Sequence, residues 1–264
     1  MKREIKQIVA VLVALFLMSC SADEMPSNSI DPPVSEGIPP TIPTTPTVPN
    51  EPTTTPPTSR TINYLALGDS YTIGQSVCET CRYPEQLKAR LVPIYPETNF
   101  SLKVIATTGW TTSNLLSAIN SQKLEPNYDL VTLLIGVNNQ FQHKDFAVYK
   151  NEFPELLQKA ITLAKGDNKN VIVLSIPDYM YTPFGKAYDE MKRAEISAEI
   201  DQYNAFAESF CMAKGVQFIS ITDITRQGLN NTSLVASDGL HPSEIAYKLF
   251  VDRMFIPVKN ILMD

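Results

Sequence analysis

Five short apolar runs, separated by segments with helix-like spacing, constrain the fold of this 264-residue chain more than any other feature. Each run is rich in Val, Ile and Leu and is bounded by turn residues. This is the pattern of strands that are buried on both faces of a parallel sheet. The runs span residues 62–67, 102–106, 130–135, 171–176 and 216–221.

Segments with helical periodicity lie between these runs and after the last one. They cover residues 84–92, 112–119, 145–164, 186–213 and 243–254. The alternation predicts a three-layer α/β/α sandwich around a central, mostly parallel five-stranded sheet with right-handed crossovers. Ligands of such sheets bind at the carboxyl ends of the strands. Ser70, Gly109 and Asn138 follow the first three runs, so we expect them on one rim of the sheet.

The first apolar run ends in Gly-Asp-Ser at residues 68–70, which is either an ordinary turn or a nucleophile at the mouth of the sheet. A serine nucleophile needs a neighbouring base, and the chain has two histidines. His241 lies three residues after Asp238 and before a predicted helix, so the aspartate can turn back and hold the imidazole, as in a Ser-His-Asp triad. His143 lies in the polar stretch FQHKD, which is typical of a surface residue.

Four motifs occur in order along the domain: GDS at 68–70, TTGWTTSNL around Gly109, GVNN at 136–139 and DGLH at 238–241. Together they resemble the motifs of the SGNH hydrolases, also called GDSL esterases/lipases. The resemblance covers residues 61–264. It implies the flavodoxin-like fold of that family and a serine esterase that cleaves acyl esters through an acyl-enzyme.

The resemblance also assigns roles to the residues of the motifs. Ser70 is expected to be the nucleophile, His241 the base and Asp238 the residue that orients His241. The oxyanion hole is expected to consist of the Ser70 N–H, the Gly109 N–H and the Asn138 side-chain amide. Preorganised donors of this kind stabilise the negative charge that forms on the carbonyl oxygen. Asp69 is expected to be a structural hydrogen-bonding residue.

Two features depart from common patterns. The third motif of the family usually ends in Asp, whereas this chain has Asn139. The usual aspartate looks structural, so we do not expect the change to abolish catalysis. Ser70 also lies in G-D-S-Y-T and outside the G-x-S-x-G elbow of α/β-hydrolases, which argues against that fold.

The N-terminal segment has the pattern of an export signal. A basic start is followed by an apolar stretch at residues 8–18, which is too short to span a bilayer as a helix of about 20 residues. Leu-Met-Ser-Cys at 17–20 resembles a bacterial lipobox, so we expect a lipoprotein signal peptide at 1–19 and lipidation of Cys20. The alternative is an ordinary signal peptide. Residues 20–60 are rich in Pro and Thr and are predicted to be a disordered tether.

The remaining cysteines fit an exported protein. Cys78 and Cys81 form a Cys-Glu-Thr-Cys sequence, and a local disulfide is expected in an oxidising compartment. Zinc would require a second pair of ligands with suitable spacing, which the sequence lacks. Cys211 lies in a helical segment and is expected to be a buried small hydrophobic residue. The sequence requires no metal or organic cofactor.

The formal net charge of −6 and the lack of a basic stripe argue against nucleic-acid binding. The expected partners are a small-molecule, lipid or glycan ester and, through Cys20, a bacterial membrane at its periplasmic or outer face. A lipase- or lysophospholipase-like activity is favoured. A carbohydrate O-acetyl esterase and a non-catalytic binding lipoprotein are the alternatives. The aromatic segment 177–185 either lines an acyl pocket or packs on its neighbours, and Trp110 is a candidate wall of the site.

Overall fold

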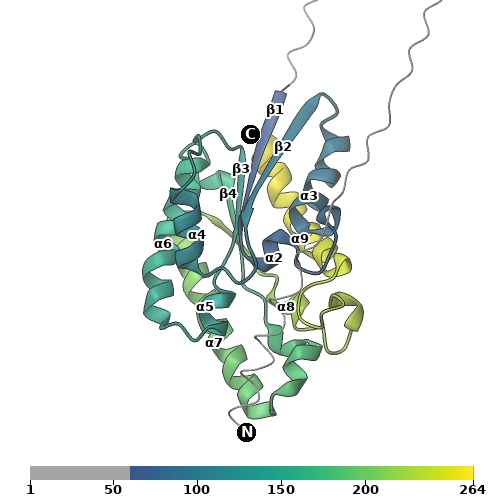
Figure 1. Ribbon diagram of the computed structural model, residues 1–264. Helices are drawn as coiled ribbons and strands as arrows, with labels where there is room; N and C mark the ends of the chain where they lie inside the picture. The colour runs from purple at the N-terminus through teal and green to yellow at the C-terminus, as the bar shows by residue number, and fades with distance from the viewer. Residues whose placement is uncertain (1–59, 264) are drawn as a thin grey trace, which may run out of the picture. The chain divides into compact units, whose positions relative to one another are not determined.

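The computed structural model describes residues 60–263, which form one α/β unit (Figure 1). The expected signal peptide at 1–19, Cys20 and all of the expected tether except Arg60 lie outside the described residues. The described part corresponds to the domain expected at residues 61–264.

A five-stranded sheet forms the centre of this unit, with the strand order β2-β1-β3-β4-β5. All four strand pairs are parallel, which confirms the predicted parallel sheet. The residues of β1, β3 and β4 are mostly buried on both faces, as their continuous apolar sequences require. The strands are β1 (Arg60–Gly68), β2 (Thr98–Ala106), β3 (Leu130–Leu134), β4 (Val171–Leu174) and β5 (Gln217–Ile219).

Helices cover both faces of the sheet and complete the predicted three-layer sandwich (Figure 1). One face carries α4 (Thr112–Asn120), α6 (Phe146–Leu163) and α7 (Glu190–Lys214). The other face carries α3 (Tyr83–Leu91) and α9 (Glu244–Met263), which pack against each other. Within residues 60–263, no helix has the length and apolar character needed to cross a membrane.

Several element boundaries differ from the sequence expectation. We expect the last helix to end at residue 254, but α9 continues to Met263 through Pro257. Proline cannot donate a hydrogen bond to the preceding turn, yet Val258 and Leu262 beyond it are buried in the core. Burial of this apolar stripe offsets the lost hydrogen bond. Short helices not expected from periodicity also follow three strands: α2 (Ser70–Ile73), α5 (Val137–Phe141) and α8 (Thr222–Thr225).

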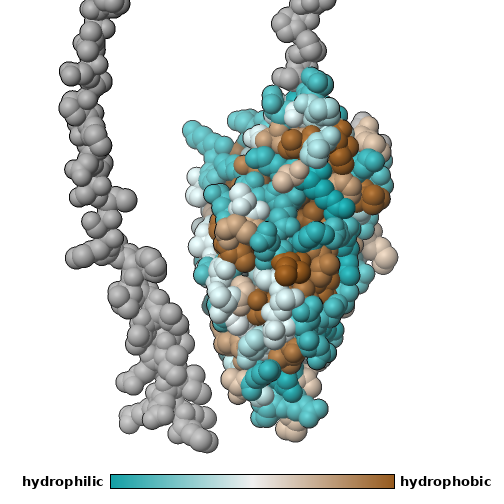
Figure 2. Space-filling view, turned by 90° about the vertical axis from the view of Figure 1, so that its right-hand side faces the viewer, coloured by the Kyte–Doolittle hydropathy of each residue, from teal (hydrophilic) through white to brown (hydrophobic). Residues whose placement is uncertain are grey.

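The face covered by α3 and α9 is mostly hydrophilic, with separate small apolar groups (Figure 2). Ile245, Leu249 and Ile256 of α9 are among the exposed apolar residues of the protein. Scattered exposed apolar side chains are normal on soluble domains.

The strand order places a topological switch point between β1 and β3. The chain moves from β1 to β2 on one side, then returns across β1 to β3 on the other side. Loops that leave the carboxyl ends of β1 and β3 therefore diverge and open a crevice. Ser70 follows β1, and Asn138 follows β3, so the two residues lie on either side of this crevice.

Gly68 ends β1 for a steric reason and not because of a positive φ, which this residue does not have. A Cβ atom at position 68 would lie 2.1 Å from Thr72 Oγ1 and 2.4 Å from the Leu134 carbonyl oxygen. The missing side chain allows α2 to begin directly above the β1–β3 pair. Gly68 therefore fixes how closely Ser70 approaches the sheet.

A buried ion pair fixes the segment that follows β4. Asp178 is fully buried, and its Oδ2 lies 3.0 Å from Nε of Arg226. Asp178 Oδ1 accepts a hydrogen bond from the Met180 N–H, and the Asp178 N–H donates to Thr225 Oγ1, both at 3.0 Å. These bonds connect the 3₁₀ turn Tyr179–Tyr181 to the region of α8.

The Arg226→Met variant is expected to lose about 3–5 kcal/mol of unfolding free energy, because it leaves the buried Asp178 carboxylate without its counter-ion. Chemical denaturation of the full chain at neutral pH measures this loss.

Arg253→Met is the matched control, since Arg253 pairs with the solvent-exposed Asp223, whose side chain is 57% accessible. This variant is expected to lose about 0–1 kcal/mol. Equal losses in the two variants would contradict a special contribution from the buried pair.

Candidate active site

Ser70 is the first residue of α2 and lies directly above the end of β1. The preceding residue, Asp69, caps this helix because its side chain accepts a hydrogen bond from the Tyr71 N–H at 3.0 Å. Gly74 ends α2 with a left-handed φ of 78°. Ser70 is only 3% exposed, so the short helix holds it in a defined position.

Asp69 is fully buried, and burial raises its pKa to about 7. The hydrogen bond from the Tyr71 N–H and the nearby Asn138 side chain oppose this shift. Asp69 therefore caps α2 through Oδ1, in agreement with the structural role expected for it, while its Oδ2 has no hydrogen-bond partner within the described residues.

His241 and Asp238 form a hydrogen-bonded pair. The Nδ1 atom of His241 lies 2.6 Å from Asp238 Oδ2. The other carboxyl oxygen, Oδ1, accepts the backbone N–H groups of Leu240 and His241, both at 2.9 Å. Both carboxyl oxygens are thus engaged, and the bond at Nδ1 leaves Nε2 of the ring for a reaction.

The pKa of Asp238 is low for identifiable reasons. Partial burial acts to raise it, but hydrogen bonds from the Ser76 hydroxyl and from His241 lower it to about 2. Asp238 therefore stays ionised throughout the neutral range.

Gly109 lies in a turn that follows β2. Its φ is +82°, a left-handed value that favours glycine, and no atom lies within 4 Å of a Cβ built at this position. The Gly109 carbonyl oxygen accepts a hydrogen bond of 2.8 Å from the Gln142 side chain. Backbone conformation, and not crowding, is therefore what requires glycine here.

Asn138 is the second residue of α5, which follows β3, and its Nδ2 donates to the Trp110 carbonyl oxygen at 3.1 Å. In this structure, the amide thus has Trp110 and Asp69 as its polar neighbours. The Trp110 side chain packs against the hydrophobic core. It is not among the residues around the cavity described next, so it does not form the wall that we expected.

The four motifs meet at one cavity of about 190 Å³, to which Ser70, Gly109, Asn138 and His241 all contribute. Within residues 60–263, the Ser70 hydroxyl and the His241 ring are not joined by a hydrogen bond. Catalytic hydrogen bonds often shorten only when a substrate is bound. The other residues that line the cavity are Tyr71, Thr108, Val137, Phe141, Tyr179 and Leu240.

Most of the apolar lining was not predicted. The Tyr71 ring packs against His241 with a centroid distance of 5.1 Å. Phe141 is 42% exposed, and its ring lies against those of Tyr179 and Phe184 at centroid distances of 5.5 and 6.2 Å. Adjacency to the GDS and GVNN motifs is the only sequence signal for Tyr71 and Phe141.

The aromatic segment 177–185 contributes to the site through Tyr179. Its hydroxyl donates to Gln140 Oε1 at 2.6 Å, which connects the segment to α5. Met180 is buried elsewhere and does not line this cavity. Both interpretations of the segment are therefore partly correct, because Tyr179 lines the cavity and Met180 packs on its neighbours.

Three further predictions concern residues outside the cavity. His143 is exposed, as expected for a surface residue. Cys211 is fully buried, and burial raises the pKa of its thiol to about 12. The sulfur atoms of Cys78 and Cys81 are bonded to each other at 2.08 Å.

Asn139 is fully buried and connects the loop after β3 to the start of α4. Its Oδ1 accepts the Thr112 N–H at 2.9 Å, and its Nδ2 donates to Thr112 Oγ1 at 2.6 Å. The Thr112 hydroxyl in turn donates to Glu152 Oε2. Asn139 thus has a structural role, as we expected for the third motif.

We predict that Asn139→Asp destabilises this protein, although it introduces the residue that the third motif usually carries. The Thr112 hydroxyl has one hydrogen, and Glu152 accepts it, so a new carboxylate would face the hydroxyl oxygen without a donor. The expected loss of unfolding free energy is about 1–3 kcal/mol, measured by chemical denaturation.

The double variant Asn139→Asp/Glu152→Gln provides the control. The glutamine amide can donate to Thr112 Oγ1 and free the hydroxyl hydrogen for the new carboxylate, so stability should partly return. If Glu152→Gln fails to restore any stability in the Asn139→Asp background, the hydrogen-bond assignment is wrong.

Comparison with solved structures supports the fold. A lipase from a goat rumen metagenome has a TM-score of 0.59 and 20% identity, over 74% of this chain and 97% of that chain. A lipase/acylhydrolase from Enterococcus faecalis has a TM-score of 0.58 and 17% identity, over 75% and 96%. An acetylxylan esterase from Geobacillus stearothermophilus has a TM-score of 0.55 and 20% identity, over 75% and 94%.

A search among curated proteins found no match to the sequence. The model of the GDSL-like lipase/acylhydrolase family matches residues 66–249, which include all four motifs and every residue of the cavity. Because this match spans well over half of the 264-residue chain, the protein belongs to the GDSL-like lipase/acylhydrolase family.

Proposed function

We propose that this protein is a serine ester hydrolase in which Ser70 attacks the carbonyl carbon of an acyl ester. The observation that carries the proposal is the 2.6 Å contact between Asp238 and His241 beside the cavity that also contains Ser70. In this arrangement, His241 Nε2 takes the proton of the Ser70 hydroxyl. The ionised Asp238 holds the ring and stabilises the imidazolium.

The tetrahedral intermediate carries its negative charge on the former carbonyl oxygen. Within the described residues, neither the Ser70 N–H nor the Gly109 N–H donates a hydrogen bond to another protein group. This supports their assignment as oxyanion donors. Asn138 would supply a third donor, for which the oxyanion must compete with the Trp110 carbonyl oxygen.

Collapse of the intermediate breaks the bond between the acyl carbon and the alcohol oxygen. The His241 imidazolium gives its proton to the departing alkoxide, which leaves as the alcohol. A water molecule then attacks the acyl-enzyme, with His241 again acting as the base, and releases the carboxylic acid and free Ser70.

The size of the cavity supports a short acyl group. About 190 Å³ is less than the 300–1,000 Å³ typical of drug-sized ligand sites, and its lining is mainly apolar and aromatic. This favours the second candidate function, an O-acetyl esterase acting on carbohydrate, over hydrolysis of long-chain lipid esters. The similar Geobacillus protein is an acetylxylan esterase.

Hydrolysis of p-nitrophenyl esters from acetate to decanoate by the full chain tests the proposal. Wild type should be active, and Ser70→Ala should reduce kcat by at least about 10³-fold because the nucleophile is lost. Asn138→Ala should reduce kcat by about 10²–10³-fold if its amide acts as an oxyanion donor.

Covalent labelling with a fluorophosphonate distinguishes an enzyme from a binding protein, and Ser70→Ala is its control. An optimum at acetate would support the acetyl esterase, whereas an optimum at octanoate or decanoate would support a lipid acyl hydrolase. A wild-type protein that resists labelling and hydrolyses none of these esters would contradict the serine mechanism.

We also propose that the protein is exported and lipid-anchored through Cys20, which rests on the sequence pattern at residues 1–20. Metabolic labelling with an alkyne fatty acid should mark the wild-type protein in a bacterial host. Cys20→Ala should abolish that mark, and equal labelling of both proteins would contradict the anchor.

A further inference from the structure

Asp238 has a second side-chain partner besides His241. The Ser76 hydroxyl donates to Asp238 Oδ2 at 2.6 Å, the same oxygen that lies 2.6 Å from His241 Nδ1. Ser76, which is 162 positions from Asp238, and His241, which is 3 positions from it, thus contact the same carboxylate oxygen. A charge-assisted donor of this kind restricts rotation of the carboxylate and thereby the direction of its bond to the imidazole.

The backbone at Ser76 is held in an unusual conformation. Its φ is +66°, a left-handed value that is uncommon for residues other than glycine. Such a conformation persists only where surrounding contacts enforce it. The neighbouring Gln75 provides one of them, since its Oε1 accepts a hydrogen bond of 2.6 Å from Thr108 Oγ1, beside Gly109.

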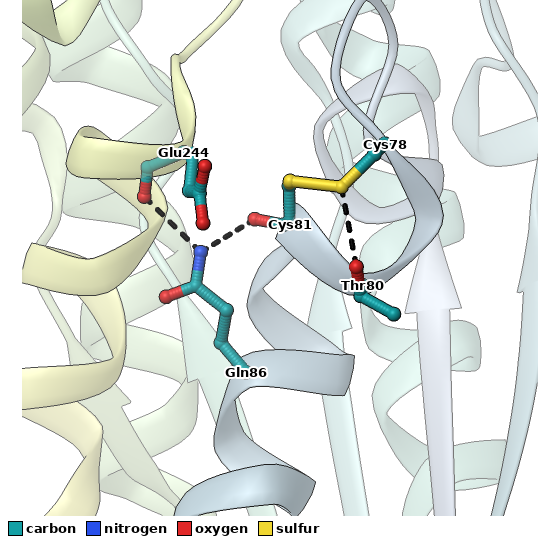
Figure 3. Close-up of a disulfide and its surroundings, with 5 residues drawn as sticks. All are labelled: Cys78, Thr80, Cys81, Gln86 and Glu244. Carbon is teal, nitrogen blue, oxygen red and sulfur yellow. Dashed lines mark hydrogen bonds between the residues drawn. A yellow bond between two sulfur atoms is a disulfide. The ribbon is translucent and has the colours of Figure 1, made fainter.

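The disulfide that follows Ser76 provides a second restraint. Cys78 and Cys81 close a short ring of backbone, and Gln86 Nε2 donates to the Cys81 carbonyl oxygen and to the Glu244 carbonyl oxygen (Figure 3). Gln86 belongs to α3, and Glu244 begins α9, three residues after His241. The segment that carries Ser76 is therefore linked through Gln86 to the start of α9, three residues after His241.

We propose that Ser76 is a positioning residue of the catalytic site, which orients the Asp238 carboxylate toward His241 and is held in place by segment 74–82, in which the disulfide joins Cys78 to Cys81. Ser76 acts through Asp238 and does not touch the reacting atoms. This inference rests on the proposed function, because it assigns Ser76 to the machinery of the serine esterase. Ser76 lies outside the four sequence motifs.

Two variants separate the hydroxyl from the backbone. Ser76→Ala removes the hydroxyl and keeps a Cβ, while Ser76→Gly removes the hydroxyl and also suits the left-handed φ. For both, kcat for p-nitrophenyl acetate should fall about tenfold, the order expected for one hydrogen bond to a charged group, while KM changes less than twofold. Ser121→Ala is the control and should keep wild-type kcat, because it removes an exposed hydroxyl whose one hydrogen-bond partner within residues 60–263 is the Ala118 carbonyl oxygen.

A double-mutant cycle tests whether Ser76 acts through Asp238. In the Asp238→Asn background, Ser76→Ala should cause no further loss of kcat. Multiplicative losses in the cycle, or a Ser76→Gly variant with wild-type kcat, would overturn the proposal, since the residue would then have only a structural role.

The same assays distinguish this inference from the proposed function. A wild-type protein that neither hydrolyses the ester nor is labelled by a fluorophosphonate overturns the proposed function, and the role of Ser76 falls with it. An active wild type whose Ser76→Ala and Ser76→Gly variants keep full kcat overturns the role of Ser76 alone.

Discussion

The parallel pairing of β1 with β2 on one side and with β3 on the other determines where the chemistry of this protein lies. Because β2 is added on one side of β1 and β3 on the other, the loops after β1 and β3 run to opposite sides and leave a crevice between them. Gly68 lets α2 begin against the sheet, since a side chain would collide with the Leu134 carbonyl oxygen. The sheet thus delivers Ser70 to one side of the crevice and Asn138 to the other.

Side-chain hydrogen bonds then join the loops at the carboxyl ends of the strands to one another. Asn139 connects the loop after β3 to α4, and Gln142 donates to the Gly109 carbonyl oxygen. Gln75 and Ser76 connect the segment after α2 to Thr108 and to Asp238. The backbone hydrogen bonds of the sheet stop at the carboxyl ends of the strands. In the loops beyond these ends, polar side chains supply the rigidity that a reactive site requires.

Much of this architecture was predictable from sequence because buried parallel strands leave continuous apolar runs that are easy to recognise. The position of Ser70 after the first run and the spacing of Asp238 and His241 are likewise local patterns. Ser76 was not predictable, because its contact spans 162 positions and depends on a left-handed backbone. The extension of α9 through Pro257 was also missed, since burial of Val258 and Leu262 outweighs a local helix-breaking preference.

Two aspartates lie near the cavity, and their surroundings drive their pKa values in opposite directions. Burial raises the pKa of Asp69 to about 7, whereas hydrogen bonds from Ser76 and His241 overcome partial burial and lower that of Asp238 to about 2. A carboxyl that is half protonated near neutral pH is a poor partner for an imidazolium, but one that stays ionised is a good one. Under the proposed mechanism, this separation explains why Asp238 orients His241 while Asp69, one residue from the nucleophile, serves as a helix cap.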